Sequence, residues 1–313
     1  MNDAVRRAVE ILRAGGLVAF PTETVYGLGA DAANPAAMAR LYAVKRRPAD
    51  HPVIVHFPDA ASAFEWARDV PEAAHRLAAC FWPGPLTLIL KRSPQARDFV
   101  TGGQDTVGLR VPSHAVAQAL LHAFGGGVAA PSANLFGRLS PTTAAHVRED
   151  LGAAVDLVLE GEPVSVGIES TIVDLSGEAA VLLRPGHIRQ EEIETVLGCG
   201  IASKRVDSPR HSGGLERHYA PRTPARLVPA HALDAQIAQL GARVAVLAFS
   251  RPDERVARWI RMPRDPAAYA QRLYGALREL DAAHCEMLLI ESPPEAPAWT
   301  AVLDRLRRAA GAG

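Results

Sequence analysis

The chain has 313 residues, 48% hydrophobic and 22% charged, so it can build one large domain or two ordinary domains with a sizeable core. Its 34 lysine and arginine residues are balanced by 34 aspartate and glutamate residues. This balance argues against a general nucleic-acid or membrane-surface binder, because such proteins carry a basic excess. The scattered cysteines, Cys80, Cys199 and Cys285, have no metal-site spacing and are typical of a reduced, cytoplasmic protein.

Apolar periodicity predicts a chain in which helices and strands alternate, as in α/β folds. Residues 1–13 resemble an amphipathic helix and not a signal peptide, and no apolar run is long enough to span a membrane. Helices are predicted at 3–14, 36–45, 59–68, 71–82, 114–124 and 189–197. Strands are predicted at 17–20, 53–57, 86–91, 106–112, 128–130, 156–159, 170–175 and 181–184. One more helix is expected after Ser140, a suitable N-cap, with Pro141 in the first helical position.

The strand at 17–20 is predicted to stop at Pro21 and to lead into a polar loop, PTETVYGLGAD (21–31). Gly27 and Gly29 let the backbone bend where a side chain would clash. A polar loop at the end of a buried strand is where open α/β sheets place ligands. Turn chemistry uses the same residue types, so a loop whose threonines only satisfy backbone groups is an equally open interpretation.

Basic residues stand near several predicted strand and helix ends. Lys45 and Arg47 follow a helix, where they could meet an anion or simply complement the helix dipole. Arg110 lies amid apolar neighbours and needs an anionic partner, either an internal carboxylate or a ligand. Together with Arg184 and nearby hydroxyl residues, these positions suit a triphosphate and a second anionic ligand. His56, within a strand, reads first as a satisfied core residue.

The composition changes near residue 203, where Pro, Gly and Ser without apolar periodicity predict a linker at 204–224. We therefore expect a first domain at 1–203 and a second at 225–313. In the second, strands at 225–228, 243–249 and 287–291 alternate with helices at 231–240, 266–280 and 298–310, which predicts a small parallel sheet. It has neither a GxGxxG nor a Walker loop, so no nucleotide site is expected there.

Nine blocks in order make the first domain and the linker recognisable, although each alone would be a weak signal. They are PTETVYGLGADA (21–32), KRRP with HPVIVHF (45–48 and 51–57), FWPGPLT (81–87), GLRVP (108–112), PSAN (131–134), SPTT (140–143), ESTIVDL (169–175), LLRPG (182–186) and HYAP (218–221). Together they resemble the YrdC-like family in its long, two-domain form. The second domain matches only in position and in its β-α alternation.

The resemblance implies an α/β fold with a twisted, mixed sheet around a concave basic cavity, and a small Rossmann-like second domain. It implies a nucleotidyltransferase that makes L-threonylcarbamoyl-adenylate and pyrophosphate from L-threonine, bicarbonate or carbon dioxide, and ATP with Mg²⁺. The product would serve threonylcarbamoylation of the adenosine beside the tRNA anticodon, through a separate transferase complex. Direct contact with tRNA is left open.

The resemblance also assigns roles to residues. The threonine site would contain Thr24, His56, Arg110, the backbone near Ala130, and Ser170. Arg110 would hold the threonine carboxylate as a bidentate fork. The ATP site would contain Lys45, Arg47, His51, Thr106, Ser132, Asn134, Ser140 and Arg184, with His218 or Tyr219 of the linker closing over it. No side chain is assigned as a general acid or base, and no protein metal site is expected.

Two other functions compete with this interpretation. A YrdC-like module could bind double-stranded RNA without chemistry, but the neutral net charge and the lack of interleaved aromatic residues count against it. The same fold could transfer a carbamoyl group to another amine, but such relatives carry zinc-binding segments whose cysteine pattern is missing here.

Overall fold

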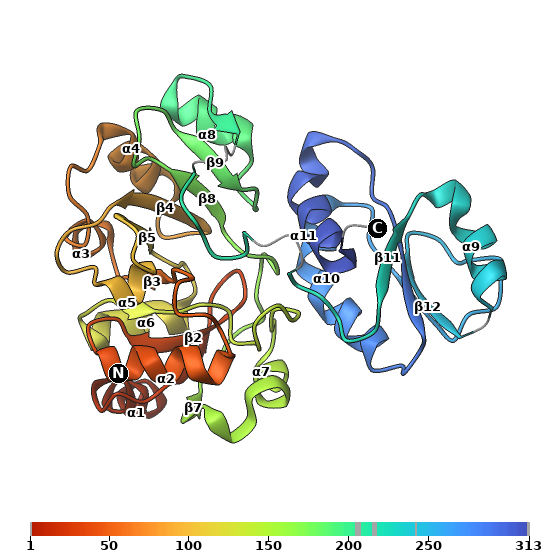
Figure 1. Cartoon of the computed structure of the whole chain (residues 1–313), viewed down its shortest axis with the longest axis horizontal. Coiled ribbons are helices and arrows are strands. Elements are labelled where there is room, and N and C mark those ends of the chain that lie inside the picture. The colour runs from red at the N-terminus through yellow and green to blue at the C-terminus, as the bar shows by residue number, and fades with distance from the viewer. Residues whose placement is uncertain (1, 204–207, 215–217, 242, 312–313) are drawn as a thin grey trace. The chain divides into compact units, whose positions relative to one another are not determined.

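The computed structural model describes residues 2–203, 208–214, 218–241 and 243–311 (Figure 1). The chain divides into two compact units. The first contains Met1–Phe136, Pro141–Ser165 and Glu169–Gly214, and the second contains Gly137–Ser140, Val166–Ile168 and Leu215–Gly313. The boundaries placed at 203 and 225 from sequence stay a prediction, and residues 204–207 and 215–217 of the predicted linker lie outside the described residues.

The first unit is built on a ten-stranded mixed sheet in the order β10-β9-β8-β4-β5-β3-β6-β2-β1-β7. The strands are β1 (Val18–Pro21), β2 (Tyr26–Asp31), β3 (Ile54–His56), β4 (Leu86–Lys91), β5 (Thr106–Arg110), β6 (Val128–Ala129), β7 (Leu157–Val158), β8 (Thr171–Asp174), β9 (Val181–Arg184) and β10 (Ala202–Ser203). The helices are α1 (Asp3–Arg13), α2 (Pro35–Lys45), α3 (Ala60–Phe64), α4 (Glu72–Phe81), α5 (Asp98–Thr101), α6 (Ala115–Phe124), α7 (Ala144–Leu151) and α8 (Gln190–Leu197).

The stretch predicted as a long polar loop is mostly a hairpin. β1 pairs antiparallel with β2, with Val18 opposite Gly29 and Pro21 opposite Tyr26, so only residues 22–25 form the turn. Gly29 is needed for packing, because a Cβ there would lie 2.9 Å from the Phe20 ring and 3.0 Å from the Val18 carbonyl oxygen. The loop prediction failed because the sequence does not distinguish a glycine that makes room for a neighbouring ring within a strand from a glycine that bends a loop.

The helix predicted from Ser140 begins later. α7 starts at Ala144, and its N-cap is Thr143, whose hydroxyl accepts from the His146 N–H at 3.2 Å. The segment SPTT offers three hydroxyl side chains that could cap, and sequence alone does not rank them. Ser140 is fully buried and belongs to the second unit.

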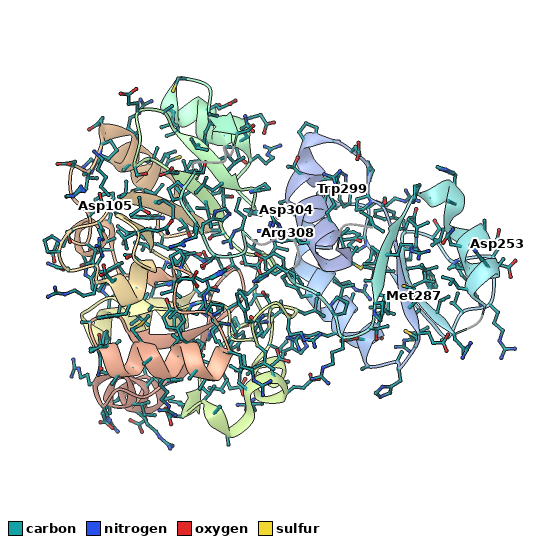
Figure 2. The ribbon with its side chains drawn as sticks, in the orientation of Figure 1. Asp105, Asp253, Met287, Trp299, Asp304 and Arg308 are labelled. Atoms are coloured by element: carbon teal, nitrogen blue, oxygen red, sulfur yellow. The ribbon has the colours of Figure 1, made fainter. Side chains whose placement is uncertain are left out.

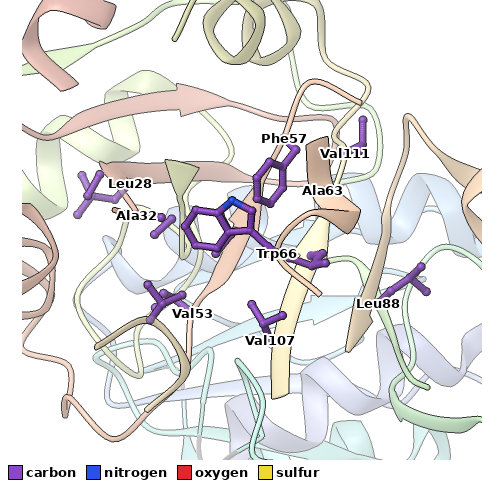
Figure 3. Packing of buried hydrophobic residues seen from close by; sticks show 14 of the residues in the cluster. Leu28, Ala32, Val53, Phe57, Ala63, Trp66, Leu88, Val107 and Val111 are labelled. Atoms are coloured by element: carbon purple, nitrogen blue, oxygen red, sulfur yellow. The ribbon is translucent and has the colours of Figure 1, made fainter. Parts of the chain in front are cut away.

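Alternation along the strands separates an apolar face of the sheet from a partly polar one. One face carries residues such as Val55, Leu88 and Val107 into a large apolar cluster. Figure 3 labels Leu88 and Val107 among the members of this cluster. On the opposite face, His56 stands beside Arg110 and Arg110 beside Thr87 in the strand register. The polar side chains of three neighbouring strands therefore share one side of the sheet.

The second unit contains a four-stranded sheet in the order β11-β14-β12-β13, with every pair parallel. Its elements are β11 (Ala225–Val228), α9 (Leu233–Leu240), β12 (Val244–Ala248), β13 (Arg258–Arg261), α10 (Pro266–Asp281), β14 (Met287–Glu291) and α11 (Thr300–Ala310). On α11, Arg308 donates from Nε to Asp304 at 3.0 Å (Figure 2).

The predicted α/β class, with a mixed sheet and a second parallel sheet, is thereby confirmed. Strand β13 was not predicted. No helix in the described part of the chain has both the length and the apolar character that a bilayer crossing needs.

Candidate active site

Arg110, at the end of β5, has an internal carboxylate partner. Its Nη2 donates to Glu23 at 2.7 Å and to the Thr24 hydroxyl at 2.9 Å. The other Glu23 oxygen accepts from the Ser113 N–H at 3.0 Å. Glu23 and Arg110 are each only 5% exposed. The sequence left open whether the anionic partner of Arg110 is an internal carboxylate or a ligand. The structure shows an internal carboxylate, that of Glu23, which accepts from Nη2 of Arg110.

Two polar atoms beside this ion pair have no hydrogen-bond partner among the described residues. They are Arg110 Nε and His56 Nδ1, and both are buried. Burial, and secondly the positive charge of Arg110, lower the pKa of His56 to about 3, so its imidazole is neutral at physiological pH. A buried polar group left unpaired costs about 1–3 kcal/mol, so these two atoms gain when a ligand or a water pairs with them.

The hydroxyls of the turn form a chain with a defined direction. Arg110 can only donate, so the Thr24 hydroxyl accepts from it. The Thr22 hydroxyl donates to the Val25 carbonyl at 2.6 Å, so in the 2.8 Å bond between the two threonines Thr24 is the donor. Thr22 and Glu23 thereby fix the conformation of the turn that holds Arg110.

A second cluster continues along the same face of the sheet. Ser170 shares a 2.8 Å hydrogen bond with Thr87 and accepts from Arg184, both at its hydroxyl and at its carbonyl oxygen, at 3.0 Å. Arg184 also donates to the Ser212 carbonyl at 3.0 Å. The predicted threonine-site residue Ser170 and the predicted ATP-site residue Arg184 are therefore in direct contact.

Lys45 and Arg47 are buried, and each donates to backbone carbonyls. Lys45 Nζ donates to Ser132 and, at 2.6 Å, to Asn134, and burial lowers its pKa well below the usual value. Arg47 donates to Pro52 at 2.7 Å. These bonds join the end of α2 to the loop after β6 and to the segment before β3. The two basic side chains, predicted to bind ATP, therefore also hold these two segments in place.

The remaining predicted residues lie in different places. The His51 ring stands edge-on to Phe136 at 5.4 Å, Thr106 begins β5, and the Ala130 N–H donates to Ile54 at 3.0 Å. His218 and Tyr219 belong to the second unit, where their rings lie 4.2 Å apart. Their distance from the residues of the first unit stays outside what is described.

Two family models cover nearly the whole chain. The Sua5/YciO/YrdC model, described as telomere recombination, matches residues 10–186. The model described as the C-terminal domain of threonylcarbamoyl-AMP synthase matches residues 188–311. The threonylcarbamoyl-AMP synthases of Pyrococcus abyssi and Bacillus subtilis are each 38% identical over 98% of this chain, and the matches cover 94% and 93% of those proteins. This chain belongs to the threonylcarbamoyl-AMP synthase family.

Solved structures agree with membership of this synthase family. P. abyssi Sua5 complexed with L-threonine superposes with a TM-score of 0.90 at 38% identity, covering 98% of this chain and 94% of that one. E. coli YciO superposes with a TM-score of 0.53 at 27% identity, over 60% of this chain and 92% of that one. The first relative thus has the fold of both units, whereas the second matches a part of the chain.

Sequence reasoning missed four residues of this candidate site: Thr22, Glu23, Thr87 and Ser212. Glu23 was visible as the only carboxylate between the strand and the glycines, but nothing in the sequence paired it with a residue 87 positions away. Thr87 had a usable signal, because it is a hydroxyl residue among the apolar residues at the start of its strand.

Proposed function

We propose that this member of the synthase family forms L-threonylcarbamoyl-adenylate and pyrophosphate from L-threonine, bicarbonate or carbon dioxide, and ATP. The threonine part of this proposal rests on the buried Arg110 Nε, which has no hydrogen-bond partner in the described part of the chain and lies beside the neutral His56. A carboxylate is the ligand group that an unpaired guanidinium N–H binds best. Because Nη2 is already bonded to Glu23, we expect the threonine carboxylate at Nε, and not in the fork first expected.

The reaction joins three substrates in two bond-forming steps. Threonine, bound as a zwitterion, first loses its ammonium proton to water. The free amine then attacks carbon dioxide, and a second proton leaves the nitrogen to give a carbamate. A carbamate oxygen then attacks the α-phosphorus of ATP, and pyrophosphate leaves. The carbamate is unstable in water, so the residues must hold all three substrates together away from bulk solvent. The deep burial of His56, Arg110 and Ser170 supports such a closed site.

The basic side chains of the site suit the ATP phosphates. Lys45, Arg47 and Arg184 are buried around the loops predicted to hold the nucleotide. The two arginines would neutralise phosphate charge, and Lys45, whose pKa burial lowers, would hold the loop after β6 in place. We expect Mg²⁺ to enter with ATP, because in nucleotide sites it is bound mainly by phosphate oxygens and water. When bound, it would add to this neutralisation.

The product is a reactive mixed anhydride, so a second protein must use it promptly. We expect a transferase complex that passes the threonylcarbamoyl group to the adenosine beside the tRNA anticodon. A cytoplasmic location and direct contact with tRNA stay predictions.

Mass spectrometry of the products tests this function. With ¹³C-labelled bicarbonate, threonine and ATP, we expect an adenylate that carries the label and gains its mass over the unlabelled product. An unlabelled threonyl-adenylate would contradict the proposal and point to ordinary amino-acid activation.

A further inference from the structure

The cluster around Arg110 is electrically balanced before any ligand arrives. Glu23 supplies one negative charge and Arg110 one positive charge, 2.7 Å apart, and both side chains are nearly sealed from solvent. His56 adds no charge, because burial and Arg110 keep its imidazole neutral. Net charge is expensive to bury, so a sealed cluster of zero net charge best accepts a ligand that is itself neutral overall.

We propose that Glu23 is a selectivity-determining and positioning residue: its charge makes the threonine pocket accept a zwitterionic amino acid and reject the corresponding hydroxy acid. The inference rests on the proposed function, because it assumes that threonine binds at Arg110. It gives Glu23 a role besides orienting the guanidinium, and no direct contact between Glu23 and the substrate is required.

The charge argument separates three ligands of nearly the same shape. L-Threonine is a zwitterion. 3-Hydroxybutyrate lacks the ammonium group and is an anion, and L-threoninol lacks the carboxylate and is a cation. Each analogue would bring an uncompensated charge into the balanced cluster of Glu23 and Arg110. We therefore expect both to bind more weakly than threonine.

The decisive variant is Glu23→Gln, which keeps the size and the acceptor oxygen but leaves the positive charge of Arg110 uncompensated. The ratio of 3-hydroxybutyrate affinity to threonine affinity, measured by calorimetry, should rise by about tenfold or more over the wild type. Glu23→Asp keeps the charge and should keep the wild-type ratio, even if its affinities fall. If the substitutions only disturbed the shape of the pocket, both variants would bind more weakly, and the ratio of 3-hydroxybutyrate affinity to threonine affinity would keep its wild-type value.

A measurement on the wild type tests the inference if Glu23→Gln does not fold. Both 3-hydroxybutyrate and L-threoninol should bind at least about tenfold more weakly than threonine, and equal affinities of 3-hydroxybutyrate and threonine would overturn the inference. The matched control for Glu23→Gln is Glu160→Gln, which removes an exposed carboxylate paired with Arg148 at 2.6 Å and should leave all ratios unchanged.

The outcomes separate this inference from the proposed function. If the wild-type protein does not bind threonine, the proposed function is wrong. If it binds threonine but the ratio does not move in Glu23→Gln, the function stands and the charge-balance inference is wrong.

Discussion

The Arg110 guanidinium donates to the Glu23 carboxylate at 2.7 Å, across the 87 residues that separate the turn after β1 from the end of β5. Removing one partner of such a buried pair leaves an uncompensated charge, which costs about 3–5 kcal/mol. The arginine expected to bind the substrate is thus also part of the fold. Substitutions that keep its charge are therefore the cleaner probes of binding.

Arg110→Lys tests the role of the unpaired Nε. Lysine keeps the positive charge near Glu23 but has no N–H at that position. Threonine affinity should fall by more than about 1 kcal/mol, the scale of a charge-assisted hydrogen bond, while ATP affinity holds. Calorimetric titration measures both. The control is Arg148→Lys at an exposed ion pair, and unchanged threonine affinity in Arg110→Lys would place the carboxylate elsewhere.

The stability of the protein should depend on pH through His56. Its folded pKa of about 3 lies below the ordinary value of 6.5, so the unfolded state binds the proton more readily in this window. This contribution of His56 to the free energy of unfolding is fully present above pH 6.5 and is lost as the pH falls toward 3. The free energy of unfolding then falls by at most about 1.4 kcal/mol per pH unit.

Denaturant unfolding at several pH values checks this dependence. In His56→Gln, the part of the pH dependence of the unfolding free energy that comes from His56 should disappear. In His122→Gln, a control at an exposed histidine, that part should remain. A His56→Gln variant with the wild-type slope would mean that His56 is not the group responsible.

Arg47→Ala should lower both ATP affinity and stability. From sequence alone, this change is expected to weaken ATP binding by more than about 1 kcal/mol with little loss of stability. The structure changes the second part, because Arg47 is 7% exposed and donates to the Pro52 carbonyl at 2.7 Å. The neighbouring Arg46 is exposed, so Arg46→Ala is the matched control. If Arg47→Ala binds ATP as tightly as the wild type, Arg47 has only a structural role.

Residues 208–214 should stabilise the first unit. Arg184 donates to Ser212, and Arg210 exchanges hydrogen bonds with Gln104 at 2.7 and 3.0 Å. A chain cut after Gly214 should therefore be more stable than one cut after Ser203, by at least about 1 kcal/mol. Equal unfolding midpoints of the two truncated chains would show that these bonds contribute nothing.

The sequence predicted the elements whose local pattern matches their environment. The strands at 86–91, 225–228 and 287–291 have the predicted bounds, because each is a mainly apolar segment between turn residues. β13 was missed because its sequence, RWIR, has an arginine at each end, so this edge strand carries little apolar alternation.

The candidate site was predictable only in part. Individual polar residues near strand ends are visible in the sequence, and the resemblance named most of them. Their partners are not visible, because the contact of Glu23 with Arg110 depends on strand order and register. The same holds for Lys45, whose two carbonyl acceptors are 87 and 89 residues away.

Pyrophosphate release in buffer depleted of carbon dioxide tests the central claim most directly. With threonine and ATP alone, release should stay near background, and added bicarbonate should restore it. Release should also need threonine, and serine should support it less well, because a pocket that fits the threonine methyl loses about 1 kcal/mol without it. Full release from threonine and ATP without bicarbonate would contradict the account.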